Sequence, residues 1–316
     1  MFWFTKAQAK GFPKRLRMAL ESMELHQNND TINDVKLYVS KITDTLNVDS
    51  YNRENLPHII NKKLYRDKTV ANILKFMPYF DQTMNNSVST LLQSSIREDP
   101  TDSLPKYLIN HKEALDTLLS YLSIPKLSSI ANILIRECIR NESFVSYLFE
   151  YQYVSSFIIY LLGDNFEMVT NAFKTYEEML NSQISVSSAY ILSHYDIFSL
   201  HFKQLLRSNV YIVSLLSIPL ILNFITREEC RPILMYFVND PYNLECICRH
   251  LESRSKKVRS NAYSIFKLFV INPHRTQLIR TELHENKTKL IRLIQKVQLP
   301  DDEELLNERR SVISNL

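Results

Sequence analysis

Glycine is almost missing from this chain, because only Gly11 and Gly163 occur among its 316 residues. A phosphate-binding loop or a dinucleotide-binding turn needs several glycines within a few residues, so that the backbone can approach the phosphates. An EF-hand loop needs a glycine at its sixth position among acidic and amide residues, and neither glycine lies in such a loop. Asn-Gly and Asp-Gly, which favour tight β-hairpins, do not occur. The composition argues against nucleotide and calcium binding by these motifs and favours an all-helical protein.

Cysteine is scarce as well. Cys138, Cys230, Cys246 and Cys248 are scattered in a long chain without a secretory signal, so we expect reduced thiols and a cytoplasmic protein. No sign of charge dominates, since 38 Lys and Arg are mixed with 34 Asp and Glu along the chain. A nucleic-acid-binding protein usually gathers its bases on one face, so we expect a solvated surface instead. The 45% hydrophobic content is enough for a sizeable core.

Two stretches bear on membranes and targeting. Residues 208–226, SNVYIVSLLSIPLILNFIT, carry no charge and approach the length of a membrane span. Pro219 stands in the middle and polar residues are spread through the stretch, so a buried helix pair is the favoured prediction and a membrane span the alternative. The start of the chain is basic and serine-poor. We expect residues 1–25 to form an N-terminal arm or capping helix, with a transit peptide as the alternative.

What the chain does contain is a recurring helical pattern. Five segments can be laid over one another, and they cover residues 89–99, 131–141, 172–181, 216–226 and 262–272. Their starts lie 42, 41, 44 and 46 residues apart. Several segments end in Asn or a charged residue, where a helix must stop. A period near this length is typical of armadillo and HEAT repeats, which have two or three helices per unit.

This period predicts the architecture. One unit cannot cover its own apolar face, so units stack and bury a continuous core. We predict an all-α, armadillo/HEAT-like helical-repeat solenoid that forms a single domain over residues 1–316. It would be a curved rod with a concave binding face, closed by a capping helix at 300–316, where acids precede bases as the helix dipole favours. Asn272-Pro273 would then be a joint between helices, because proline cannot continue a helix.

No group of residues supports an enzyme, a metal site or a cofactor. Cys246, Cys248 and His250 lie close together in sequence, but a zinc finger needs a second pair of ligands. Residues two apart also point about 200° away from each other on a helix. The stretch 194–196, His-Tyr-Asp, lacks a nucleophile in a recognisable turn. Buried or half-buried helix cysteines and a helix cap are the favoured interpretations.

A pair of arginines, Arg136 and Arg140, is a candidate for binding a partner or a neighbouring helix. Arg136 and Arg140 lie four residues apart and share one helix face, and Glu137 is three residues from Arg140. Two arginines on one face can hold a partner's carboxylate or brace a neighbouring helix. Bracing is the favoured prediction.

Several stretches together resemble a known family. The residues ANILIRECIRNESF (131–144), FEMVTNAFKTYEEMLN (166–181), SHYDIFSLHFKQLLRS (193–208) and SKKVRSNAYSIFKLFVINPHRTQLI (255–279) are similar to consecutive stretches of the mouse protein-25 scaffolds, also named calcium-binding protein 39. The resemblance implies a helical-repeat rod without catalytic activity. It would bind a sterile-20-type kinase or a related pseudokinase on its concave face and hold the kinase's regulatory helix in the active position, in cell polarity or morphogenesis signalling.

The resemblance also nominates residues. The candidates for the concave face are Arg136, Arg140, Lys174, Tyr176, Phe266 and Lys267. Packing between repeats is the favoured alternative for Tyr176 and Phe266.

The family also has a hydrophobic pocket near the C-terminal end. This pocket takes a Trp-Glu-Phe tail of the partner, and an arginine faces the glutamate. Ser214 occupies that arginine's place here. Either the tail is different and more apolar, or Lys257, Arg259 or Lys267 supplies the charge.

The competing prediction is a helical-repeat adaptor for another protein or a nucleic acid. A row of basic residues along the inner groove would favour nucleic acid. The chain has only one short basic run, formed by Arg254, Lys256, Lys257 and Arg259. That run is more typical of a solvated helix start.

Overall fold

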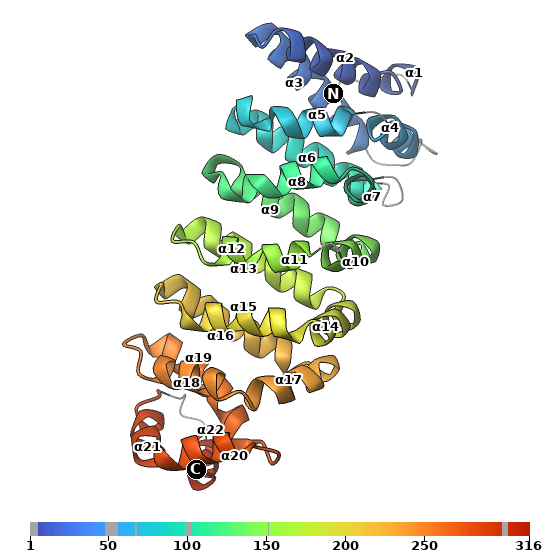
Figure 1. The fold of residues 1–316 in the computed structure, drawn as a ribbon. Coiled ribbons are helices and arrows are strands. Elements are labelled where there is room, and N and C mark those ends of the chain that lie inside the picture. Colours follow the sequence, from blue (N-terminus) through green and yellow to red (C-terminus); the bar gives the residue numbers. More distant parts are fainter. Residues whose placement is uncertain (1–5, 48–55, 67, 99–102, 151, 299–302) are drawn as a thin grey trace. The chain divides into compact units, whose positions relative to one another are not determined.

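The computed structural model describes residues 6–47, 56–66, 68–98, 103–150, 152–298 and 303–316 (Figure 1). Every regular element within these ranges is a helix. Contacts divide the chain into two compact units, Met1–Tyr147 and Leu148–Leu316. Each unit is a series of similar helices, and each is described by itself.

The helices of the first unit, with short 3-10 turns named η, are α1 (Lys6–Ala9), α2 (Phe12–Leu25), α3 (Asn29–Leu46), α4 (Leu56–Leu64), α5 (Thr69–Phe76), η2 (Met77–Tyr79), α6 (Gln82–Glu98), α7 (Leu104–Asn110), α8 (Lys112–Ser120), η3 (Tyr121–Ser123) and α9 (Pro125–Ile139). The boundary falls within α10 (Glu142–Glu150). The helices of the second unit are α11 (Tyr153–Ser156), α12 (Ile158–Leu161), α13 (Phe166–Asn181), α14 (Ile184–Ser193), α15 (Tyr195–Arg207), α16 (Tyr211–Ile225), η4 (Glu228–Cys230), α17 (Arg231–Val238), α18 (Pro241–Leu251), α19 (Lys256–Ile271), α20 (Gln277–Glu285), α21 (Lys287–Gln295) and α22 (Glu303–Ser314).

The five segments with the recurring pattern belong to α6, α9, α13, α16 and α19, the last and longest helix of each repeat. We call these the third helices. In the first unit α3, α6 and α9 pack one on the next, and in the second unit α13, α16 and α19 do the same (Figure 1). The middle helices form parallel series, α2, α5 and α8 in one unit and α15 and α18 in the other. The prediction of an all-α helical-repeat solenoid is confirmed. The single-domain organisation and the concave face stay predictions.

Local sequence explains where the third helices begin and end. The side chains of Asn165 and Ser255 accept the backbone N–H groups of the first turns of α13 and α19, at 3.1 and 3.3 Å. Such N-caps satisfy donors that a helix start leaves free. At the end of α19, Asn272 leaves the helical conformation and its side chain accepts the N–H of His274 at 2.9 Å. The predicted joint at Asn272-Pro273 is therefore a turn between α19 and α20.

The uncharged stretch 208–226 forms one helix, α16, with Pro219 inside it. The predicted helix pair is wrong, because the proline is accommodated within a continuous helix. Proline has no N–H for the carbonyl four residues earlier, and the Leu215 carbonyl accepts the side-chain amide of Asn261 on α19 at 3.4 Å. Among the described helices, none is by itself long and apolar enough to cross a membrane, and only α16 joined to 228–238, bent by 93°, passes such a test by length and composition.

Helices also close the two ends of the described structure. In α2 one apolar face is buried against α3 and α5, through residues that include Phe12, Leu16 and Leu20. At the other end α22 packs on α19 and α21 and buries Val312. The predicted capping segments, 1–25 and 300–316, thus contain packed helices, while residues 1–5 and 300–302 lie outside the described structure.

Candidate functional site

One candidate surface lies on the third helices of the second unit. On α16 the side chains of Tyr211, Leu215, Pro219 and Leu222 recur at helical spacing and are exposed or half-buried. Such a strip leaves apolar area uncovered on a helix whose opposite side is buried in the core. We call these four side chains the α16 strip.

Charged residues border this surface. Lys174 on α13 is exposed and lines a shallow depression together with Glu177, Glu178 and Arg227, the last of which follows α16. Asn223, one residue beyond the α16 strip, donates to the Glu177 carboxylate at 3.5 Å and so joins α16 to α13. Lys174 is thus a nominated residue that a partner could reach, and Arg227 is a neighbour that the sequence did not nominate.

The other nominated residues of the second unit have partners within the chain. Tyr176 and Phe266 are 0% exposed, and the Tyr176 ring stacks on Phe157 with centroids 6.0 Å apart. Neither side chain can contact a partner in this conformation, and packing between helices is the role that their burial fits. Lys267 forms an ion pair with Glu308 and thereby joins α19 to α22.

Of the two nominated arginines of the first unit, Arg140 contacts a buried carboxylate, that of Glu137. Glu137 is 9% exposed. One of its carboxylate oxygens lies 2.9 Å from Arg140 and the other 3.4 Å from Arg97 on α6. Arg136 is half-buried on the same helix. The carboxylate beside Arg140 therefore belongs to the chain itself. The ion pair that joins α9 to α6 is Arg97–Glu137, so bracing of a neighbouring helix by Arg136 and Arg140 stays a prediction.

We expect bracing by Arg97 and Glu137 to be measurable as a coupling. Because both arginines are largely exposed, each ion pair is worth about 0.2–1 kcal/mol. The replacements Arg97→Ala and Glu137→Ala should each lower the free energy of unfolding, and the double replacement should cost about 0.5 kcal/mol less than their sum. Urea unfolding of the four proteins measures this, with Lys112→Ala as an exposed control. Strictly additive effects would contradict the bracing role.

The nominated tail-pocket residues differ in the contacts that their side chains make within the chain. Ser214 is 8% exposed and its hydroxyl donates to the Ser208 carbonyl at 3.0 Å. The Arg259 guanidinium donates to the carbonyls of Ser253 and Arg254, at 2.7 and 3.1 Å, and so holds the turn before α19. Lys257 is exposed. Two of the three side chains are therefore occupied by contacts to the backbone.

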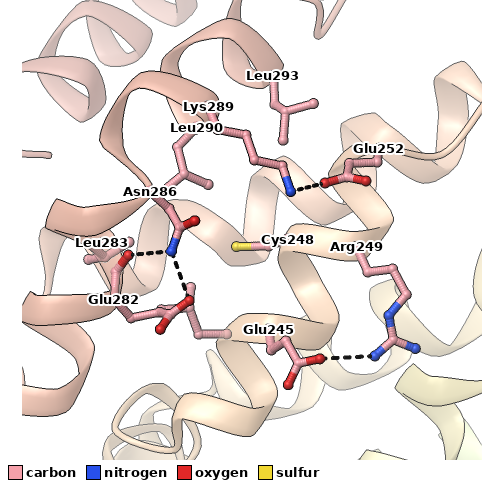
Figure 2. Close-up of a pocket in the computed structure, with 11 residues that line it drawn as sticks. Glu245, Cys248, Arg249, Glu252, Glu282, Leu283, Asn286, Lys289, Leu290 and Leu293 are labelled. Carbon is pink, nitrogen blue, oxygen red and sulfur yellow. Dashed lines mark hydrogen bonds and ion pairs between the residues drawn. The ribbon is translucent and has the colours of Figure 1, made fainter.

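The structure has a pocket elsewhere near the C-terminal end, between α18, α20 and α21 (Figure 2). Its volume is about 240 Å³. Its apolar lining consists of Leu244, Cys248, Leu283, Leu290 and Leu293, and its polar lining of Glu245, Arg249, Glu252, Glu282, Asn286 and Lys289. We call it the α18–α21 pocket.

Ion pairs hold most of the charged groups around this pocket. Glu245 lies 3.7 Å from Arg249, and Glu252 lies 2.5 Å from Lys289 (Figure 2). The Glu282 carboxylate accepts the Asn286 side-chain amide at 2.9 Å and has no ion pair with any residue that the structure describes. The pocket thus has three carboxylates and two cations.

Cys248 lies at the centre of the pocket (Figure 2). Burial, and next the Glu282 carboxylate, raise the pKa of its thiol to about 12, although Lys289 opposes them. The thiol is therefore neutral at physiological pH and is a poor nucleophile and metal ligand. Within the described ranges no three His, Cys, Asp or Glu side chains are grouped so as to hold a metal ion.

The other members of this sequence cluster have separate roles. Cys246 is fully buried and its sulfur accepts Arg249 at 3.8 Å. His250 is bonded through Nε2 to the Leu206 carbonyl at 2.7 Å. The sequence did not predict the α18–α21 pocket. The available signal was the spacing of Glu245, Cys248 and Glu252, which places them on one face of α18 that carries both apolar and charged groups.

The fold defines a structural class, that of all-α helical-repeat proteins. The family model described as Mo25-like matches residues 2–316, and the chain belongs to this family.

Relatives from distant organisms agree with this family. A Mo25-like protein of Schizosaccharomyces pombe is 23% identical, over 80% of this chain and 78% of its own length. A calcium-binding protein 39-like protein of Mus musculus is 24% identical, over 81% of this chain and 77% of its own length. The conidiophore development protein hymA of Emericella nidulans is 25% identical over 48% of this chain and 40% of its own length.

A solved structure supports the fold alone. The crystal structure of Kap121p bound to RanGTP matches 98% of this chain and 34% of the Kap121p chain, with a TM-score of 0.54 and 13% identity.

Proposed function

We propose that this protein is a non-catalytic scaffold that binds and activates a sterile-20-type kinase or a related pseudokinase. Membership of the Mo25-like family supports a scaffold. The observation that carries the proposal is the α16 strip, which is exposed at Tyr211 and half-buried elsewhere, with the exposed Lys174 on the adjoining helix α13. An apolar centre with charged neighbours is the usual anatomy of a protein-binding surface. The similarity to a conidiophore development protein supports a role in cell morphogenesis.

The physical route to activation is a population shift. A kinase exchanges between active and inactive arrangements of its regulatory helix, and a scaffold that binds the active arrangement more tightly increases its population. The scaffold can shift this equilibrium only by the difference between its affinities for the two states. Repeated third helices suit this task because they can offer one continuous surface to a folded domain.

The α18–α21 pocket provides a second point of attachment for the partner's tail. Engagement of a tail makes the binding of the kinase domain effectively intramolecular, and this raises the overall affinity. In this proposal the tail binds at the α18–α21 pocket, which is not lined by Ser214, Lys257 or Arg259.

The test uses the sterile-20-type kinases of the same organism. We expect the purified protein to bind at least one of them and to raise its rate of substrate phosphorylation. We also expect Lys174→Glu to weaken binding about fivefold, because reversal of one interface charge changes the binding free energy by about 1 kcal/mol. Lys112→Glu reverses an exposed charge in the first unit and should have no effect. Absence of both binding and rate enhancement for every such kinase removes the proposal.

An adaptor for another cargo is the second candidate. It is favoured only by the basic run around the start of α19, where Lys256 and Lys257 are exposed. If the cargo were a nucleic acid, its affinity would fall steeply with salt. Purification of partners from cell extract and a salt titration distinguish this function from kinase binding.

A further inference from the structure

We propose that the α18–α21 pocket selects a partner segment in which an apolar side chain stands next to a basic residue. The inference rests on the proposed scaffold function and specifies the chemistry of the tail. It differs from the acidic tail that the family resemblance implies.

The size and lining of the pocket indicate what part of a ligand fits. Its volume of about 240 Å³ lies below the ~300–1,000 Å³ of sites for drug-sized molecules, so the pocket suits one large side chain rather than a cofactor. Cys248 and Leu293 are half-buried and form the part of the apolar lining that a ligand can reach, while Leu283 and Leu290 are buried. Burial of an aromatic or aliphatic side chain against this lining is favourable.

The charges around the pocket indicate which residue accompanies that side chain. Three carboxylates, those of Glu245, Glu252 and Glu282, line the pocket, and only the first two are paired with a cation. A positive group on the ligand can therefore approach Glu282 without displacing an existing ion pair. A carboxylate on the ligand would have to compete for Arg249 or Lys289 and would be repelled by Glu282.

The carboxylates around the pocket also raise the pKa of the thiol at its centre. Glu282, Glu252 and Glu245 each raise the pKa of Cys248 in addition to the effect of burial. Each carboxylate makes the electrostatic potential in the pocket more negative. The same potential that disfavours a thiolate also disfavours a ligand carboxylate and favours a ligand cation.

The experiment uses three short fluorescent peptides that are identical except at one position and end in Trp-Lys-Phe, Trp-Gln-Phe or Trp-Glu-Phe. We expect the full chain to bind the lysine peptide most tightly and the glutamate peptide about tenfold more weakly, since the exchange removes an attraction and adds a repulsion. Fluorescence anisotropy measures the three dissociation constants. Increasing salt should reduce the preference.

Two variants test whether the α18–α21 pocket causes the preference for the lysine peptide. Glu282→Lys should reverse the preference, and the fold should tolerate it because the Glu282 side chain is exposed and bonds only to Asn286. Glu228→Lys, which makes the same change in net charge at an exposed position outside the pocket, should leave it unchanged. Circular dichroism checks the fold of both variants.

The remaining outcomes separate the inference from the proposed function. If the glutamate peptide binds as tightly as the lysine peptide or more tightly, or if no peptide binds, the inference is overturned. The kinase assay is independent of the peptides. Kinase activation without a preference for the basic peptide would leave the scaffold function standing, while a preference without kinase activation would point to another partner with a basic tail.

Discussion

Replacing Phe266 with alanine is expected to lower the free energy of unfolding by about 3–5 kcal/mol, the usual cost of truncating a buried phenylalanine. Phe266 is 0% exposed on α19, which packs between α16 and α22. The truncation removes apolar contacts and leaves a cavity that the neighbouring helices fill only in part. Urea unfolding followed by circular dichroism measures the change. Because the chain has two compact units, the loss should appear in the transition of the second unit.

Tyr176→Phe is the matched control, since it changes a buried aromatic residue without making a cavity. The Tyr176 hydroxyl is buried and has no hydrogen-bond partner among the residues that the structure describes, and burial raises its pKa. Removal of a buried, unpaired polar group should leave stability unchanged or raise it by about 1 kcal/mol. If Phe266→Ala instead left stability unchanged and abolished kinase binding, Phe266 would belong to the binding surface after all.

The repeat could be predicted from the sequence because its cause is local. Apolar residues at helical spacing and polar residues at the breaks determine where each helix forms. The segments on α6, α9, α13, α16 and α19 were found on this basis alone. The Arg140–Glu137 pair was also predictable, since residues three apart meet on one helix face.

The contacts between segments that are distant in sequence could not be predicted from local residue spacing. Arg97, the second cation beside Glu137, is 40 residues earlier in the chain, and no local spacing identifies it. The α18–α21 pocket also depends on contacts between distant segments, because Cys248 meets Glu282 and Lys289 only after α20 and α21 pack near α18. In the sequence, Cys248 has only Cys246 and His250 as chemically notable neighbours, and these argued against a zinc site and for helix cysteines without indicating a pocket.

Pro219 leaves a backbone carbonyl of its own helix without the usual N–H donor, and a residue distant in sequence donates to that carbonyl instead. A proline in a helix interior normally costs ~3 kcal/mol, because it removes one backbone hydrogen bond and crowds the preceding turn. In α16 the affected carbonyl is that of Leu215, and Asn261 on the next third helix donates to it at 3.4 Å. The Leu215 carbonyl, which lacks its helical partner because of Pro219, thus accepts a hydrogen bond from the next repeat. This explains why the helix continues through Pro219, although the sequence pattern predicted two helices there.

This arrangement predicts a specific coupling. Pro219→Ala should raise the free energy of unfolding by about 1–3 kcal/mol, because alanine supplies the missing N–H to Leu215. Asn261→Ala should cost about 1 kcal/mol in the parent chain and close to nothing when residue 219 is alanine, since the carbonyl then has its helical partner. Urea unfolding of the four proteins gives the coupling directly.

Asn223→Ala supplies the control for this cycle. Asn223 also lies on α16 and bonds to another third helix, through Glu177 at 3.5 Å, but it does not share the Leu215 carbonyl. Its replacement should therefore cost nearly the same with proline or alanine at 219, because its side chain bonds to Glu177 and not to the Leu215 carbonyl, although the two positions lie one helical turn apart. If Asn261→Ala behaved like Asn223→Ala and cost the same in both backgrounds, the Leu215 carbonyl would not be the acceptor that links α16 to α19.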